Sequence, residues 1–188
     1  MQTNLTFDDT SLLISYSNNW AQQTSSDPQL GSFFDMSYHS AQANGASANF
    51  TFNGRCRTVL SLNGNRDTDD FKGTSVYIYG SKGPGHVSIF VFFPPTVNLT
   101  SWVQSNYSVQ FDNFIVFLSA SASQSQFQQS LFSYTFNDSG PHFISLTSRY
   151  ADDDQWLDLD YVTITVNDTT ECIFLFFLGT SDLLNSIM

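Results

Sequence analysis

Aromatic rings that stand beside amide or carboxyl groups are the residues of this sequence best suited to binding a ligand. Such a ring stacks on the apolar face of a pyranose, while its polar neighbours bind the sugar hydroxyls. Three of these groupings fall at predicted strand ends or in loops. The candidate carbohydrate-binding residues are therefore Asn19, Trp20, Tyr38, Asp154 and Trp156. Trp156 is the best stacking candidate, and the alternative for Trp20, as for Tyr79, is that the ring fills the core or caps the sandwich.

Three carboxylates form a second candidate site. Asp8 and Asp9 lie near the first predicted strand, and Asp160 lies in the last one. Oxygen ligands of this kind suit Ca²⁺, so a structural calcium ion is the cofactor that we expect, if any. The alternative for Asp8 and Asp9 is that they hydrogen-bond backbone amides or face water. The acidic triplet at 152–154 lacks the spacing of an EF-hand and is interpreted as a solvated loop.

The sequence does not predict an enzyme. It lacks the nucleophile-elbow, zinc-protease, phosphate-loop and paired-cysteine motifs. His39, His86 and His142 are scattered among turn and strand residues. Glycoside hydrolysis needs two carboxyl groups, and the one glutamate is Glu171, so both groups would have to be aspartates.

Composition excludes some partners. The 188 residues are enough for a single domain. The formal charge is -11, with only 6 lysines and arginines, which disfavours nucleic acid and anionic lipid surfaces as partners. The longest apolar run, at 172–178, is too short to span a membrane, so we expect no membrane insertion of this segment.

Glycosylation signals favour a secreted or cell-surface protein. The asparagines in N-x-S/T sequons are Asn4, Asn49, Asn98, Asn106, Asn137 and Asn167. The first residues, MQTNLTFDD, show no signal peptide, so we expect the natural start to lie upstream.

The elements that must position these residues are strands. Residues 46–53 alternate apolar and polar side chains, which places Asn49 on the solvent side. Residues 76–79 alternate in the same way, and the segment is interpreted as a central strand. In residues 156–166 the apolar parity changes between Tyr161 and Val162, which predicts one strand with a wet end, or with a bulge at the switch. About eight to ten short strands between turn-rich segments predict an all-β jelly-roll β-sandwich.

Two long insertions interrupt this pattern, at 55–72 and 87–104. Each is 18 residues long, and removing both leaves continuous strand and turn patterns. The residues at the ends of each insertion, and at the start of a tail at 172–188, can be encoded by codons that contain splice-site-like nucleotide strings. We therefore interpret all three as translated introns and 1–171 as the single β-sandwich domain. Ordinary long loops are the alternative. Cys56 and Cys172 fall in these segments, so no disulfide is expected.

With the insertions removed, the sequence resembles a repeated extracellular module of surface proteins of mushroom-forming fungi. The motifs that carry the resemblance are FDDTS, YSNNW, FNG, VYIYG and LDLDYV, in this order, between residues 7 and 162. The resemblance implies a galactose-binding-like jelly roll, distantly similar to carbohydrate-binding modules. It also implies adjacent first and last strands, with a calcium ion near them.

Three functional hypotheses follow. The first is a non-catalytic module that binds glycans or cell-wall polysaccharide at the cell surface. The second is a structural or adhesive ectodomain without a small ligand. The third is the product of a mis-spliced gene, in which the insertions prevent stable folding.

Overall fold

The chain forms antiparallel sheets in the computed structural model, which describes residues 2–23, 26–41, 43–53, 74–86, 107–138, 140–149 and 156–167. The strands are β1 (Gln2–Asp8), β2 (Ser15–Tyr16), β3 (Trp20–Gln22), β4 (His39–Ala41), β5 (Ser47–Asn53), β6 (Thr74–Lys82), β7 (Tyr107–Phe111), β8 (Phe114–Leu118), β9 (Gln126–Phe136), β10 (Pro141–Ser148), β11 (Leu157–Leu159) and β12 (Tyr161–Asn167). Three short 3-10 helices are η1 (Leu30–Ser32), η2 (Phe34–Met36) and η3 (Pro84–His86).

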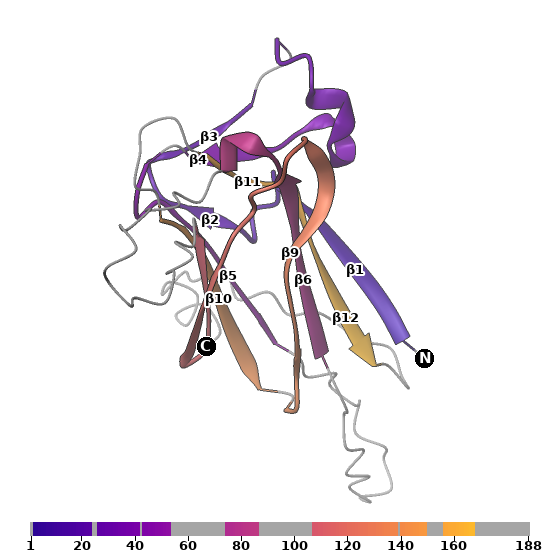
Figure 1. The fold of residues 1–188 in the computed structure, drawn as a ribbon. Coiled ribbons are helices and arrows are strands. Elements are labelled where there is room, and N and C mark those ends of the chain that lie inside the picture. The colour runs from indigo at the N-terminus through magenta and orange to yellow at the C-terminus, as the bar shows by residue number, and fades with distance from the viewer. Residues whose placement is uncertain are drawn as a thin grey trace, which may run out of the picture.

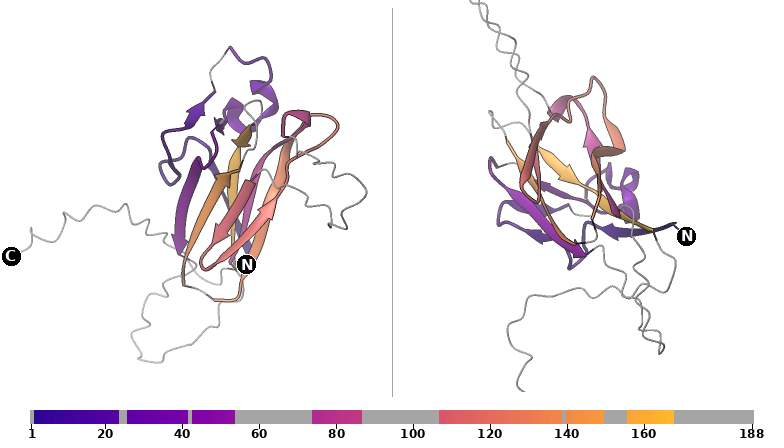
Figure 2. Two further views of the ribbon diagram at one scale, coloured as in Figure 1. Left: turned by 60° about the vertical axis from the view of Figure 1, so that its left-hand side comes forward. Right: turned by 90° about the horizontal axis from the view of Figure 1, so that it is seen from below.

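Two larger sheets make the sandwich. One has the strand order β1-β12-β6-β9, and the other has the order β2-β5-β10-β7-β8. A smaller sheet, β11-β4-β3, lies across one end, at the top of Figure 1. Figure 2 shows the two larger sheets as layers with the core between them. The fold is the predicted jelly-roll β-sandwich.

Inward-facing side chains of both layers fill the core. On β6, Val76 and Ile78 are fully buried, as the alternation of this strand predicts. Across the layers, the ring of Phe52 on β5 packs edge-on against that of Phe136 on β9, with centroids 5.7 Å apart. Burial of these side chains is the main stabilising contribution to such a fold.

Residues 156–166 form two strands and not the single strand that the sequence predicts. Leu157, Asp158 and Leu159 are buried in the small sheet, whereas Tyr161 begins β12 of the four-stranded sheet. The change of parity thus lies close to Asp160, the residue at which the chain passes from the small sheet to the four-stranded sheet.

The proposed introns at 55–72 and 87–104, the tail at 172–188, both cysteines and Asp154 lie outside the described residues. In the part of the chain that the structure describes, no helix is long and apolar enough to cross a membrane.

Candidate functional site

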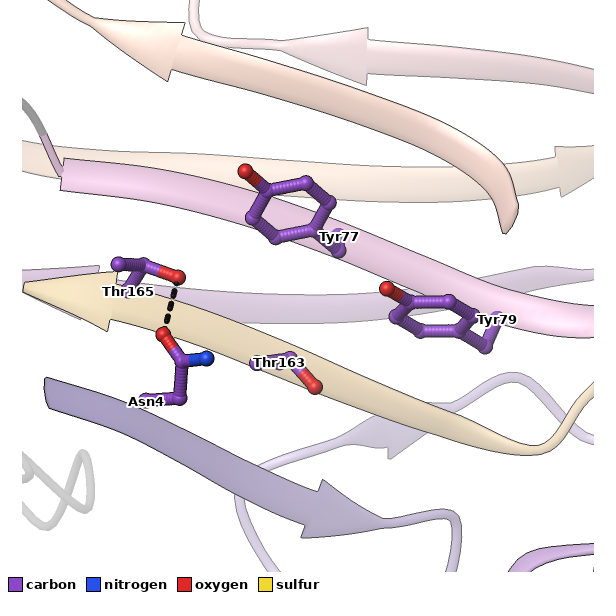
Figure 3. Close-up of a pocket in the computed structure, with 5 residues that line it drawn as sticks. All are labelled: Asn4, Tyr77, Tyr79, Thr163 and Thr165. Atoms are coloured by element: carbon purple, nitrogen blue, oxygen red, sulfur yellow. Dashed lines mark hydrogen bonds between the residues drawn. The ribbon is translucent and has the colours of Figure 1, made fainter. Parts of the chain in front are cut away.

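A groove lies on the outer face of the four-stranded sheet. Its volume is about 340 Å³, and its lining residues are Asn4, Tyr77, Tyr79, Thr163 and Thr165 (Figure 3). These side chains share one face because successive residues of a strand point to opposite sides. The register brings three strands together there, since Asn4 of β1 pairs with Thr165 of β12, and Thr163 of β12 pairs with Tyr77 of β6.

Hydroxyl and amide groups line one side of the groove. The Thr165 hydroxyl donates a hydrogen bond of 2.7 Å to the side-chain oxygen of Asn4. This bond fixes the Asn4 amide so that its nitrogen points toward Thr163 (Figure 3). All five lining residues are uncharged.

Aromatic rings line the other side. The ring of Tyr79 stacks on that of Tyr161, with centroids 4.4 Å apart and planes at 14°. The ring of Phe34 in η2 packs against the ring of Tyr161, with centroids 5.0 Å apart. With Tyr77, these rings make an aromatic row that runs from the small-sheet end of the molecule into the groove. The arrangement combines rings that can stack on a sugar with groups that can hydrogen-bond it.

This groove is not among the sites that the sequence predicts. The sequence predicts that Tyr77 and Tyr79 lie in a central strand, with the ring of Tyr79 in the core or capping the sandwich. Tyr79 is half-buried and faces outward. The signal was present in the alternation of 76–79, because Val76 and Ile78 already occupy the inward positions.

The prediction that Trp20 stacks on a sugar is wrong. Trp20 is only 8% exposed and belongs to the core cluster. Its ring packs against Tyr16 with centroids 5.4 Å apart. A sugar cannot stack on a ring that the protein already covers, so the alternative, a place in the core, is correct.

Tyr38 is also engaged by the protein. Its ring stacks on Phe33 with centroids 3.9 Å apart, and its hydroxyl hydrogen-bonds the Asp27 carboxylate. Burial, followed by the nearby Asp27, raises the pKa of the Tyr38 hydroxyl. One face of the ring is therefore unavailable to a ligand.

Asn19 and Trp156 lie at the end of the small sheet opposite Tyr38. Trp156 precedes Leu157, which pairs with Ala41, whereas Tyr38 precedes His39, which pairs with Leu159. Trp156 and Tyr38 are thus offset by four residues, roughly 13 Å along the strands. Asn19 is exposed beside Trp20, at the Trp156 end, so Asn19 and Trp156 do not form one site with Tyr38.

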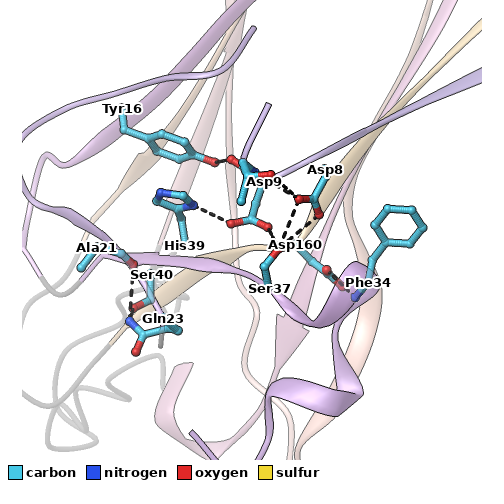
Figure 4. A network of polar contacts seen from close by, with 11 residues as sticks. Asp8, Asp9, Tyr16, Ala21, Gln23, Phe34, Ser37, His39, Ser40 and Asp160 are labelled. Atoms are coloured by element: carbon cyan, nitrogen blue, oxygen red, sulfur yellow. Dashed lines mark hydrogen bonds and ion pairs between the residues drawn. The ribbon is translucent and has the colours of Figure 1, made fainter. Parts of the chain in front are cut away.

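The predicted metal ligands do come together. β1 pairs with β12, and the Asp9 amide donates to the Asp160 carbonyl oxygen at 3.0 Å. Figure 4 shows Asp8, Asp9 and Asp160 in one polar network with Ser37 and His39. The Ser37 hydroxyl hydrogen-bonds Asp9 at 2.5 Å and Asp8 at 3.2 Å. The His39 Nδ1 lies 2.5 Å from the other Asp9 oxygen.

Asp160 has the free oxygen of this network. Its Oδ1 accepts a 2.8 Å hydrogen bond from the Phe34 amide, but its buried Oδ2 has no hydrogen-bond partner among the described residues. The pKa of Asp160 is raised to about 7, mainly by burial; the hydrogen bond from the Phe34 amide lowers it, and the negative charges of Asp158, Asp9 and Asp8 contribute to the rise.

These residues fit a calcium ion only in part. The carboxylate oxygens and the free Oδ2 of Asp160 are suitable ligands. However, both Asp9 oxygens are held by protein partners, and no group of three histidine, cysteine or acidic side chains within the described ranges is arranged to hold a metal. An ion here has to displace Ser37 or His39 from Asp9.

Ser81, His86 and Asp158 form a cluster that the sequence did not indicate. The Ser81 hydroxyl lies 3.0 Å from His86 Nε2 and also hydrogen-bonds the Asp158 carboxyl group. The same residue types occur in hydrolases, but here the exposed fractions are 6%, 1% and 1%, so no substrate reaches them. The remaining ring nitrogen of His86 lies 2.7 Å from the Trp156 carbonyl oxygen. Burial lowers the pKa of the His86 imidazole and raises the pKa of the Asp158 carboxyl group. Because its hydrogen bonds join β6, η3 and β11, the cluster is a structural link between these elements.

Comparisons with protein families and with curated protein sequences both found no match. Among solved structures, a family two carbohydrate esterase from Cellvibrio japonicus is 15% identical, with a TM-score of 0.48 over 93% of this chain and 36% of that chain. A Podospora anserina GH26-CBM35 β-(1,4)-mannanase is 12% identical, with a TM-score of 0.42 over 89% of this chain and 28% of that one.

A family 35 carbohydrate-binding module from Clostridium thermocellum is 10% identical, with a TM-score of 0.43 over 86% of this chain and 97% of the module. The chain spans 36% of the length of the esterase and 28% of the length of the mannanase. Identities and TM-scores at this level assign neither a family nor a function.

Proposed function

We propose that this protein is a non-catalytic carbohydrate-binding module that holds a glycan in the groove on the four-stranded sheet. The observation that carries the proposal is the pair Tyr77 and Tyr79, which line the groove opposite Asn4 and two threonines. Rings beside hydroxyl and amide groups suit the two faces of a sugar, one apolar and one polar.

The glycan is a neutral one. Uronic acids and sulfated sugars need cationic partners, but all five lining residues are uncharged and the chain carries a formal charge of -11. Neutral cell-wall or cell-surface polysaccharide fits both facts. The sequons support an extracellular location of the protein, where such polymers occur.

A glycan array probed with the full chain, produced in a bacterial cytosol so that it carries no N-glycan, tests this proposal. We expect saturable binding to neutral glycans, which Tyr77→Ala reduces and Trp156→Ala leaves unchanged. Phe117→Ala is the control, because Phe117 lies on β8 of the other sheet and is 58% exposed. Loss of binding in Trp156→Ala alone would move the site to the small-sheet end. If the folded chain binds no glycan, the proposal fails.

A structural or adhesive role is the second candidate. The observation in its favour is the exposed apolar side chains of β8, where Phe114, Ile115 and Phe117 are 63%, 51% and 58% exposed. β8 is an edge strand of the five-stranded sheet, and such strands can pair with other proteins. Association that Phe117→Ala abolishes, without glycan binding, favours this role.

A further inference from the structure

One sequon of the chain opens directly into the groove. In Asn4-Leu5-Thr6 both the asparagine and the threonine are exposed. The other sequon whose three residues are all described, Asn49-Phe50-Thr51, lies on the opposite sheet, and its asparagine is half-buried. Asn4 is thus a lining residue of the proposed binding site and also a glycan acceptor by its sequence.

The hydrogen bond of Asn4 leaves the acceptor nitrogen available. Thr165 donates to the side-chain oxygen of Asn4, and N-glycosylation uses the nitrogen. The two interactions are therefore compatible. Because the nitrogen points toward Thr163, a sugar attached to it starts over β12, on the side of the groove that faces Tyr79 (Figure 3).

We propose that Asn4 is an N-glycosylation site whose first sugar occupies the groove and blocks it. In the attachment step a bond forms between Asn4 Nδ2 and the sugar C1. The bond between C1 and the diphosphate of a lipid-linked oligosaccharide donor breaks, the amide loses a proton, and the lipid diphosphate leaves. The attached sugar lies on Tyr79 and Thr163, the positions that an external glycan needs.

The consequence is that modification of Asn4 controls binding, and this consequence rests on the proposed function. The chain without a glycan at Asn4 binds external polysaccharide, and the modified chain does not. Occupancy of the groove by the attached sugar is a separate property, which can be measured without any external ligand.

Two variants of the same residue make the first test. The full chain is produced through a eukaryotic secretory pathway as wild type, Thr6→Ala and Thr6→Ser. Thr6→Ala removes the sequon while Asn4 stays in place, and Thr6→Ser keeps the sequon. We expect mass spectrometry to find a glycan on Asn4 in wild type and Thr6→Ser only. An unmodified Asn4 in the secreted wild type overturns the proposal.

Nitration of tyrosines with tetranitromethane then locates the sugar. Tyr79 should react more slowly in the modified wild type than in Thr6→Ala, while Tyr134, which is 36% exposed on β9, reacts equally in both. Equal nitration of Tyr79 in both proteins shows that the sugar lies outside the groove and also overturns the proposal. This result is independent of whether the protein binds an external glycan.

Binding to immobilised neutral polysaccharide completes the test. Modified wild type and Thr6→Ser should bind at least about tenfold more weakly than Thr6→Ala and than wild type from a bacterial cytosol. Equal binding with Asn4 modified contradicts the control of binding by modification. If the unmodified chain also fails to bind, the proposed function fails, while protection of Tyr79 still decides where the sugar lies.

Discussion

The ring of Tyr79 on β6 lies nearly parallel to that of Tyr161 on β12, with centroids 4.4 Å apart. The two residues are direct partners in the register of the sheet. Because one face of Tyr79 rests on Tyr161, the stack holds Tyr79 at the edge of the groove. Tyr161 is therefore a positioning residue for the proposed site.

Replacing Tyr161 should change binding through Tyr79. We expect Tyr161→Ala to weaken glycan binding by up to about tenfold, since an aromatic pair contributes about 0.5 to 1.5 kcal/mol. Tyr161→Phe keeps the stack and should bind like wild type. The measurement is the dissociation constant of the neutral glycan found on the array. A loss of the same size in Tyr161→Phe would show that the hydroxyl matters instead.

Gly80 is a second position where the packing makes a sharp prediction. A Cβ there would lie 2.6 Å from the Asp158 carbonyl oxygen and 2.7 Å from Leu131 Cδ1. We expect Gly80→Ala to lower the free energy of unfolding by about 1 to 3 kcal/mol through overpacking, as measured by chemical denaturation.

Gly31→Ala is the matched control for this variant. A Cβ at Gly31 has nothing within 4 Å, and the change should stay within about 0.5 kcal/mol. Equal stability of Gly80→Ala and wild type would mean that β6 and β11 are less closely packed than the structure has them.

Alternation alone predicted much of the fold. Val76 and Ile78 face inward, as their spacing indicates, and residues 47–53 form β5 with Phe50 and Phe52 buried. The resemblance also implied the pairing of β1 with β12, which the structure has. These predictions succeed because a buried face imposes a period of two on each strand.

The groove could not be predicted in the same way. It needs Asn4, Thr163 and Tyr77 on three neighbouring strands, and the pairing of strands more than 60 residues apart leaves no local pattern. For Trp20 a local sequence pattern exists, but it has two possible meanings. An aromatic residue beside asparagines has the same sequence pattern in a core as on a binding surface, so only the packing separates the two.

Asp160 should make the stability of the fold depend on pH. Its pKa is raised from 3.8 to about 7, mainly by burial, so the folded protein binds this proton between those values and the unfolded chain does not. Stability that is present at low pH is therefore lost as pH rises toward 7.

The variant Asp160→Asn isolates this effect, because its side-chain oxygen can still accept from the Phe34 amide. We expect it to match wild type below about pH 4 and to become progressively more stable than wild type as the pH rises to 7, with a constant difference above that, as measured by denaturation across this range. A constant difference between the two proteins at every pH would contradict the assignment to Asp160.

Calcium should offset the repulsion among these carboxylates. We propose that Ca²⁺ binds Asp160 Oδ2 with Asp8 and Asp9, after Ser37 or His39 has released Asp9. Millimolar Ca²⁺ at pH 8 should then raise the Tm of wild type but not that of Asp160→Asn. Mg²⁺ is the control ion. An unchanged Tm of wild type would contradict calcium binding at these carboxylates.

The affinity of the groove for a neutral oligosaccharide is the measurement that tests the central claim most directly. Isothermal titration of wild type, Tyr77→Ala and Phe117→Ala, each without a glycan at Asn4 and each with a thermal melt to establish folding, separates the groove from the exposed β8. The account predicts that Tyr77→Ala loses about 1 kcal/mol of binding free energy, about fivefold in Kd, and that Phe117→Ala matches wild type. Unchanged affinity in a folded Tyr77→Ala would contradict it.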